Sequence, residues 1–232
     1  MCELSIVILS YKAETFLEEF VQQVHNELKN DLKNTFEIIL VANYDDHQDT
    51  TPIIAKKISN EYHNIKVLAL KKRGRMGWDM RKGLEASKGR YICVLDGDGQ
   101  MPASDIISVY SIIKTGKFDI VKTYRTIRHD GWYRMLLSKT YNIIFNLLYR
   151  PNIHLRDINA KPKIITRSAY KQLSLQSNDW FTDAEIMIQA INLQLSICEI
   201  ATVFYKNERR KSFVNIRTVL EFTYNLFYYR FR

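Results

Sequence analysis

Two aspartates one glycine apart stand out in the stretch RYICVLDGDGQMP, from Arg90 to Pro102. Mostly apolar, β-favouring residues precede Asp96, which predicts a buried strand that ends at the first carboxylate. On an extended backbone Asp96 and Asp98 point to the same side. Neighbouring carboxylates repel each other unless a cation or proton lies between them, and carboxylate oxygens suit Mg²⁺ or Mn²⁺. We therefore expect Asp96 and Asp98 to bind a divalent metal ion, with support from Gln100.

Two other local structures can contain the same D-x-D pattern. Asp-Gly is common in turns, so the pair by itself is also compatible with ordinary turn chemistry. A calcium loop of the helix-loop-helix type starts with D-x-D as well, but it requires glycine at its sixth position and glutamate at its twelfth. Met101 and Ile107 occupy these two positions. The sequence therefore excludes the calcium loop.

The composition narrows the class of protein. In 232 residues, 46% hydrophobic and 12% aromatic residues suffice for a packed core, and the net charge of +9 favours a phosphate-bearing ligand, nucleic acid or an anionic membrane as partner. The N-terminus has no basic lead or cleavage site, so we expect a strand there, and no apolar run approaches the ~20 residues of a membrane span. Three distant cysteines favour reduced thiols and a cytoplasmic location: Cys2, Cys93 and Cys198.

Strand-type and helix-type segments alternate in the first half of the chain. The apolar runs LSIVIL, FEIILVAN, IKVLAL, YICVLD and FDIVKTY are separated by segments with helical periodicity. This pattern predicts an α/β fold with a mostly parallel central sheet covered by helices on both faces. Ligands bind beyond the carboxyl ends of such strands. We expect four polar strand ends to converge there: Ser10 to Lys12, Asn43 to Asp46, Lys71 to Arg75, and Asp96 to Gln100.

The second half of the chain is less regular. It contains a long aromatic helix over 132–150, the segment LRDINAKPKIITRSAY, an acidic helix start in WFTDAEIMIQAINL, a strand in SICEIATVFY, the basic stretch KNERRKSF and a last aromatic helix over 216–232. Because no repeat, low-complexity tract or linker interrupts it, we expect a single domain over residues 1–232. The two aromatic helices have basic flanks, which is typical of helices in a membrane interface, although both could equally pack on the sheet.

These segments together resemble the family 2 glycosyltransferases with the GT-A fold, and within them the dolichyl-phosphate-mannose-synthase-like, polyprenyl-phosphate sugar transferases. The resemblance covers nearly the whole chain. Its most specific part is the spacing of Gly77, Gly83 and Gly89 before LDGDGQ, which resembles the family's G-x(5)-G-x(5)-G and D-A-D-L-Q type motifs. It implies a Rossmann-like sheet with C-terminal amphipathic helices, a nucleotide-sugar-binding half over 1–125 and an acceptor-binding half over 126–232.

The resemblance also implies roles for individual residues. Asp96 and Asp98 would hold Mg²⁺ or Mn²⁺ on the diphosphate of a nucleotide-sugar, with help from Gln100. A cation and arginines would stabilise the nucleoside diphosphate charge that develops when the anomeric bond breaks. Together with the polar strand ends, the resemblance gives these donor-binding candidates: Ser10, Tyr11, Asn43, Arg73, Asp96, Arg125, Arg209, Arg210 and Ser212.

The chain departs from the family pattern in two places. The family usually ends its second strand with D-D-G-S, whereas here Ala42 and Asn43 follow the strand and the aspartates come later. The sequence therefore does not identify the nucleotide base. The family's basic segment R-x-x-G-x-S appears with Arg210 in the place of the glycine. The basic residues of this segment match the family only approximately.

Three acidic residues are candidates for positioning the acceptor or for removing a proton from it. Asp157 in RDINAKPK resembles the family's D-x-x-S/N-G segment, and Asp183 and Glu185 in TDAE resemble its D-x-E at a helix start. The helix dipole alone also favours an acid at Asp183. A phosphate acceptor whose second pKa is near 6 is largely an oxyanion at neutral pH, so a strong base is optional.

We therefore predict a metal-dependent, inverting hexosyltransferase that acts on a polyprenyl (dolichyl or undecaprenyl) phosphate. It would lie at the cytoplasmic face of a membrane, held peripherally by its aromatic helices or by a membrane-protein partner. An alternative acceptor is a growing surface glycan such as a polysaccharide or lipopolysaccharide. A nucleic-acid-binding protein would explain the charge, but no nucleic-acid module is recognisable. A nucleotidyltransferase should have a glycine-rich, basic first loop, which LSYKAET lacks.

Overall fold

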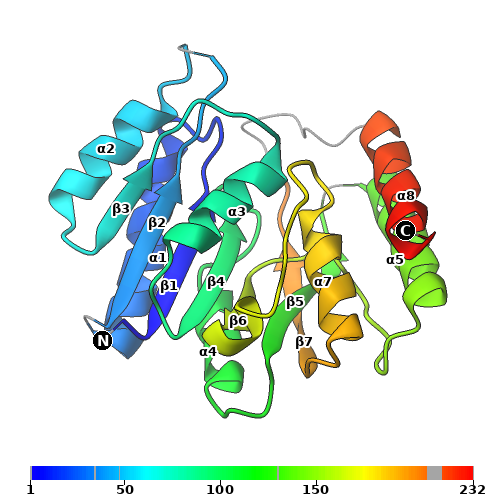
Figure 1. Cartoon of the computed structure of the whole chain (residues 1–232). Coiled ribbons are helices and arrows are strands. Elements are labelled where there is room, and N and C mark those ends of the chain that lie inside the picture. The colour runs from blue at the N-terminus through cyan, green and yellow to red at the C-terminus, as the bar shows by residue number, and fades with distance from the viewer. Residues whose placement is uncertain (1, 34, 47, 130, 208–215, 232) are drawn as a thin grey trace.

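A mixed sheet with helices on both faces forms the centre of the molecule (Figure 1). The structure is a computed structural model that describes residues 2–33, 35–46, 48–129, 131–207 and 216–231. Within them, seven strands are arranged in the order β3-β2-β1-β4-β6-β5-β7. The strands are β1 (Leu4–Leu9), β2 (Phe36–Val41), β3 (Ile65–Leu68), β4 (Tyr91–Asp96), β5 (Ile120–Arg128), β6 (Lys163–Thr166) and β7 (Ile197–Phe204).

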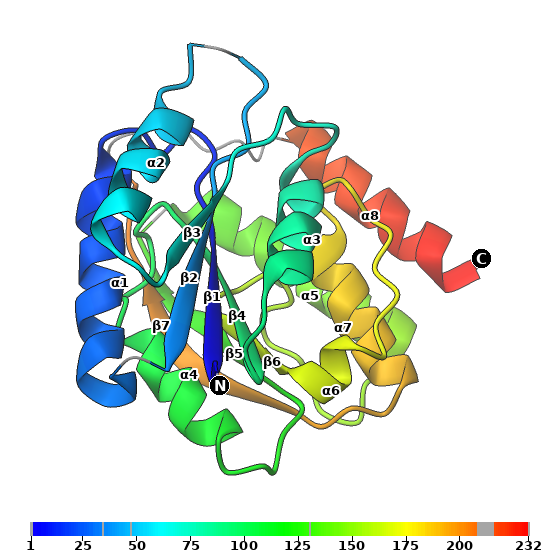
Figure 2. The same cartoon turned by 60° about the vertical axis from the view of Figure 1, so that its left-hand side comes forward.

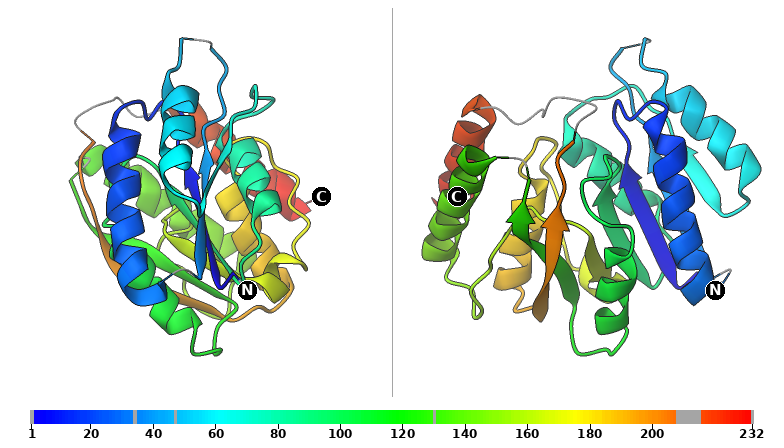
Figure 3. Two further views of the ribbon diagram at one scale, coloured as in Figure 1. Left: turned by 90° about the vertical axis from the view of Figure 1, so that its left-hand side faces the viewer. Right: turned by 180° about the vertical axis from the view of Figure 1, so that it is seen from behind.

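The helices cover the sheet in two layers (Figures 2 and 3). One layer contains α1 (Phe16–Leu32), α2 (Thr51–Glu61) and α4 (Asp105–Ile113), and the other contains α3 (Met76–Ala86), α5 (Trp132–Tyr149), α7 (Thr182–Asn192) and α8 (Ile216–Phe231), with the short α6 (Arg167–Tyr170) after β6. Alternate residues of β1 feed the two cores, since Ile6 and Ile8 belong to the first and Val7 to the second. Every residue of β1 and β2 is buried, and all are apolar except Ser5 and Glu37, which are hydrogen-bonded to each other, as expected for a sheet covered on both sides.

All strands except β6 run in the same direction. β1 pairs in parallel with both β2 and β4, whereas β6 is antiparallel to its neighbours β4 and β5. The chain moves from β1 outward to β2 and β3, and then returns to place β4 on the other side of β1. The space between the carboxyl ends of β1 and β4 is therefore a topological switch point, where ligands of such sheets bind. The predicted α/β class is confirmed, with β6 as an antiparallel insertion.

The three evenly spaced glycines are explained by close packing around α3. A Cβ atom at Gly83 would lie 2.2 Å from Cγ1 of Val7, so this glycine lets α3 approach the sheet. A Cβ at Gly77 would lie 2.0 Å from Oγ1 of Thr182, and a Cβ at Gly89 would lie 2.5 Å from the backbone nitrogen of Ser5. These distances are well below a van der Waals contact, so each position requires glycine.

Helices α5 and α8 lie side by side at the end of the sheet where β5 and β7 are found (Figure 1). Tyr149 of α5 donates a hydrogen bond of 2.7 Å to the carbonyl of Leu226, a fully buried residue of α8. The inner faces of both helices join the second core, while their outer faces carry exposed apolar side chains. No helix among the described residues is long and apolar enough to cross a membrane.

Candidate functional site

The two aspartates lie at the switch point, at the carboxyl end of β4. Asp96 is the last residue of β4 and pairs with Leu9, the last residue of β1, and its side chain is 32% exposed. The Gly97 amide donates a 2.9 Å hydrogen bond to the Leu9 carbonyl. A Cβ at Gly97 would lie 3.0 Å from the same oxygen, so the glycine lets the turn rest directly on the end of β1. We call Asp96, Gly97 and Asp98 the D-x-D turn.

Gln100 connects the D-x-D turn to the end of β7. Its backbone amide donates to Oδ1 of Asp98 over 3.1 Å, and its side-chain amide donates to the Tyr205 carbonyl over 2.9 Å. The Tyr205 amide in turn donates to the Gln100 carbonyl over 2.8 Å. These contacts position the turn and bring the start of the basic stretch, which begins at Lys206, next to the aspartates. The sequence suggested support by Gln100 but not its link to β7.

The donor set of the D-x-D turn fits a hard divalent cation with an incomplete protein shell. Asp96 and Asp98 are both partly exposed and offer carboxylate oxygens, the ligands that Mg²⁺ and Mn²⁺ prefer. No group of three histidine, cysteine or acidic side chains in the described part of the chain is arranged to hold a metal. The described residues thus supply two carboxylates to an ion at this turn and leave part of its coordination shell to other ligands.

The turn after β1 forms a small polar cluster with the turn after β2. Ser10 is buried, and its amide donates to the Val41 carbonyl over 3.0 Å. The Tyr11 hydroxyl donates to Oδ2 of Asp45 over 2.7 Å, and burial together with Asp45 raises the pKa of Tyr11. The Lys72 ammonium lies 4.1 Å from the centre of the Tyr11 ring. The structure thus brings Tyr11 together with Asp45, although Asp45 is displaced from the family position.

Asn43 is a buried link between β2, β3 and α3. Its Nδ2 donates to Oδ1 of Asp79 over 2.9 Å, and its Oδ1 accepts from the Leu70 amide over 2.8 Å. Asp79 also pairs with Lys72, yet burial outweighs that cation and raises the pKa of Asp79. Both ends of the Asn43 amide are therefore engaged by the protein. Arg73 is exposed in the next loop, and its side chain makes no recorded contact with the described residues.

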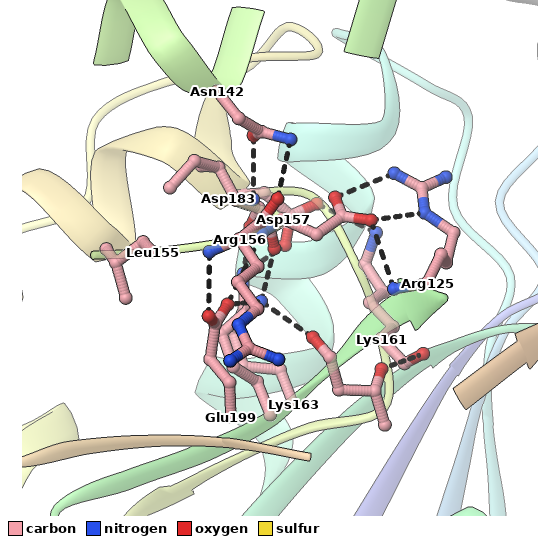
Figure 4. Close-up of polar contacts among 12 residues, drawn as sticks. Arg125, Asn142, Leu155, Arg156, Asp157, Lys161, Lys163, Asp183 and Glu199 are labelled. Carbon is pink, nitrogen blue, oxygen red and sulfur yellow. Dashed lines mark hydrogen bonds and ion pairs between the residues drawn. The ribbon is translucent and has the colours of Figure 1, made fainter. Parts of the chain in front are cut away.

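Arg125 and Asp157 form a buried bidentate ion pair (Figure 4). Nε and Nη2 of Arg125 donate to the two carboxylate oxygens over 2.6 and 2.8 Å. Burial alone would raise the pKa of Asp157, but Arg125 outweighs it and holds the pKa well below the usual range. A carboxylate with both oxygens paired and a depressed pKa is a weak base. Of the two roles predicted for Asp157, the geometry favours positioning over proton removal.

Asp183 is buried beside Lys161 and Lys163 (Figure 4), and Lys161 connects it to Asp96 of the D-x-D turn. Its oxygens lie 2.7 Å from Nζ of Lys161 and 2.6 Å from Nζ of Lys163. Nζ of Lys161 also lies 3.3 Å from Oδ1 of Asp96. The two lysines outweigh the effect of burial and hold the pKa of Asp183 below its usual value. Burial lowers the pKa of Lys163 to about 8.

Three buried lysines of this region were not among the predicted site residues. Lys161 and Lys163 are 3% and 1% exposed, and Lys122 is fully buried. Lys122 donates to the Asp157 carbonyl and lies 3.0 Å from Oε1 of Glu199. A signal was present, because a lysine inside an apolar strand such as FDIVKTY or KPKII must find a partner when the strand is buried.

Glu185 does not join this group. Its carboxylate accepts hydrogen bonds from the amides of Gln176 and Ser177 over 2.8 and 3.0 Å. Burial raises the pKa of Glu185. Residues two apart on a helix point in different directions, so Asp183 and Glu185 cannot share one ligand. Glu185 fixes the loop before α7, and the structure does not bring it to the D-x-D turn.

A protein-family comparison decides to which group this arrangement belongs. Residues 5–177 match the model of glycosyl transferase family 2, which is most of the chain. The chain belongs to glycosyl transferase family 2. The resemblance that rests on the glycine spacing and on LDGDGQ is thereby confirmed.

The curated relatives of this family 2 chain are distant. It is 27% identical to dodecaprenyl-phosphate galacturonate synthase of Rhizobium johnstonii over 175 residues, which are 75% of this chain and 50% of that protein. It is 24% identical to dolichyl-phosphate beta-glucosyltransferase of Drosophila melanogaster over 222 residues, 86% of this chain and 66% of that protein. The chain therefore spans only part of the length of these relatives.

A solved structure supports the GT-A fold of this family 2 chain. Glucosyl-3-phosphoglycerate synthase of Mycobacterium tuberculosis, in complex with Mn²⁺, uridine diphosphate and phosphoglyceric acid, superposes with a TM-score of 0.76 at 13% identity. The match covers 99% of this chain and 78% of the other. The candidate donor-binding residues Arg209, Arg210 and Ser212 lie outside the described residues.

Proposed function

We propose that this protein is a metal-dependent, inverting glycosyltransferase that moves a hexose from a nucleotide-diphosphate sugar to a polyprenyl phosphate. The observation that carries the proposal is the position of Asp96 and Asp98, side by side at the switch point of a GT-A sheet. Mg²⁺ or Mn²⁺ held by these two carboxylates would neutralise the charge that develops on the leaving diphosphate.

The donor half of the proposal rests on the polar groups around the D-x-D turn. Arg125 lies within β5 and is held in one orientation by its bidentate ion pair with Asp157. Lys72 lies over the ring of Tyr11, in the turn that follows β1. Such preorganised cations stabilise a developing anion without reorganising during the reaction. The similar solved structure binds Mn²⁺ and uridine diphosphate, which is compatible with this arrangement.

The proposed acceptor, a polyprenyl phosphate, is supported by arginine side chains near β5 and by the names of the curated relatives. Both curated relatives described above are named for polyprenyl or dolichyl phosphates. Arginine side chains stack on aromatic rings beside the donor region, Arg128 on Phe204 at 5.5 Å and Arg156 on Tyr124 at 4.5 Å. A phosphate oxyanion needs cations of this kind for binding, and as a nucleophile it needs no strong base. This agrees with the weak basicity of Asp157.

The outer faces of α5 and α8 provide a surface for the lipid. Helix α5 begins four residues after β5 ends, close to the donor region in the chain. Both helices expose large apolar side chains along their length: Trp132, Tyr133, Leu136, Ile143, Leu147, Tyr224, Phe227, Tyr228 and Phe231. Aromatic and aliphatic side chains with arginines nearby suit the interface of an anionic membrane. We propose that the protein attaches peripherally at the cytoplasmic face of a membrane through these helices, alone or together with a membrane-protein partner.

A transfer assay tests this function. Purified protein with Mn²⁺ is incubated with radiolabelled UDP-, GDP- and dTDP-sugars and with either undecaprenyl phosphate or an oligosaccharide in mixed micelles. We expect label in the lipid fraction with at least one donor, and none after Asp98→Ala. Label in the oligosaccharide alone would assign a glycan acceptor. Transfer that persists with excess EDTA or in the Asp98→Ala variant would refute the metal-dependent reaction.

A further inference from the structure

The buried Lys161 is the residue that the proposed chemistry does not yet use. It is 3% exposed, yet its ammonium reaches the partly exposed Asp96, with Nζ 3.3 Å from Oδ1 and 3.4 Å from Oδ2. Its other partner is Oδ2 of Asp183 at 2.7 Å. Lys161 therefore contributes a fixed positive charge beside both oxygens of Asp96, the first carboxylate of the D-x-D turn.

Asp183 holds this charge in place. It is itself 1% exposed and bound on its other oxygen by Lys163, so its carboxylate cannot turn away from Lys161. The Pro162 that follows Lys161 restricts the backbone at this point. The buried carboxylate of Asp183 thus orients the Lys161 ammonium toward Asp96.

From this geometry we infer that Lys161 is a positioning residue that weakens metal binding at the D-x-D turn until a diphosphate is present. Without a ligand, the ammonium neutralises part of the charge of Asp96 and repels a divalent cation on the same carboxylate. A diphosphate brings several negative charges, which attract the cation and the ammonium alike. Metal and donor then bind cooperatively, because each is stabilised by the presence of the other.

This inference rests on the proposed metal site and deepens it. It predicts that replacing the buried, well-paired Lys161 by a neutral residue tightens the binding of the metal ion. General damage to the site would weaken it. The sign therefore separates an electrostatic role of Lys161 from a purely structural one.

The experiment measures Mn²⁺ binding in the absence of nucleotide, by the loss of the electron paramagnetic resonance signal of free Mn²⁺. Lys161→Gln is the main variant, and Asp183 keeps Lys163 as a counterion in it. Lys161→Met is a second neutral variant of similar length, in case glutamine prevents folding. Lys161→Arg restores the charge. Lys163→Met is the matched control, because this lysine is equally buried and binds the same aspartate, and no contact with Asp96 is recorded for it.

We expect the neutral Lys161 variants to bind Mn²⁺ about tenfold more tightly than the wild type. Lys161→Arg and Lys163→Met should stay close to the wild-type affinity. Equal or weaker binding in a folded neutral variant, with clear binding in the wild type, would overturn the role of Lys161 alone. The titration is repeated with a nucleoside diphosphate present. If Mn²⁺ bound neither the wild type nor the neutral variants even then, the metal site and the proposed function would both be refuted. Equal Mn²⁺ affinity of all variants under both conditions would refute the role of Lys161 alone.

Discussion

Two pairs of aspartates in this molecule differ sharply in their surroundings. Asp96 and Asp98 lie at the end of a strand and are partly exposed. Asp157 and Asp183 are buried, and each has cations on both of its oxygens. A carboxylate surrounded by protein cations can hold those cations in place but is a poor base. This difference supports our proposal that the partly exposed pair binds the metal, whereas the buried pair orients Arg125 and Lys161.

The largest effect should come from the exposed pair. Asp98→Ala should lower the transfer rate about a thousandfold, because the charge of the leaving diphosphate would lose its metal. The free energy of unfolding should change by less than about 0.5 kcal/mol, as for surface substitutions. Asp31→Ala, on the exposed side of α1, is the control for both measurements. A large loss of stability in Asp98→Ala would place this residue with the buried pair.

Substitutions in the buried pair should lower the stability of the fold strongly, unlike those in the exposed pair. Asp157→Asn leaves the half-buried guanidinium of Arg125 without its counterion, and should lower the free energy of unfolding by about 3 kcal/mol. Chemical denaturation measures this change. Asp45→Asn breaks an exposed contact with Lys12 instead and should cost less than about 1 kcal/mol. Similar losses in the two variants would contradict the distinction between buried and exposed carboxylates.

The pH dependence of stability should reflect the buried pair. Cations hold the pKa of Asp157 and Asp183 below the unfolded value of about 3.9. A carboxyl with a lower pKa in the folded state stabilises the fold above the unfolded pKa, and this contribution is lost as the pH falls through the folded pKa. We therefore expect the free energy of unfolding to decrease below about pH 4. The decrease should be shallower in Asp157→Asn, and an unchanged slope would count against the depressed pKa.

A smaller effect, on membrane binding, is expected from substitutions on the outer faces of α5 and α8. Trp132→Asp removes an aromatic side chain that is 74% exposed at the start of α5, and should weaken binding to anionic vesicles about tenfold. Ile53→Asp is a matched control, because this side chain is 73% exposed on α2, in the other helix layer. Vesicle sedimentation compares the two variants. Equal weakening by both would show that α5 has no special role in attachment.

The exposed aspartate pair could be predicted from the sequence, whereas its buried supports could not. Continuous apolar runs predict parallel strands, and the carboxyl ends of parallel strands define where polar residues gather. Asp96 and Asp98 follow directly from that rule. The partners of Lys161 come from β4 and α7, and those of Lys122 from β7 and the loop after α5. Such pairing depends on β6 inserting between β4 and β5, which no local pattern predicts.

The same limit explains why the sequence predicted neither the surroundings of Glu185 nor the link of Gln100 to Tyr205. The TDAE motif predicts an acidic helix start, but the direction of each side chain depends on how α7 packs. Gln100 binds Tyr205, which is 105 residues away in the chain. Contacts between residues so far apart in the chain arise from the tertiary fold. A short motif shows which residue types are present but not which partners they contact.

Binding of nucleotide-sugars with and without metal tests the central claim most directly. A thermal shift screen of UDP-, GDP- and dTDP-sugars is run with Mn²⁺ and with EDTA, on the wild type and on Asp98→Ala, since a bound ligand raises the melting temperature according to its affinity. The account predicts that at least one nucleotide-sugar stabilises the wild type only with Mn²⁺, and does not stabilise the variant. Stabilisation of equal size in EDTA, or in Asp98→Ala with Mn²⁺, would contradict it.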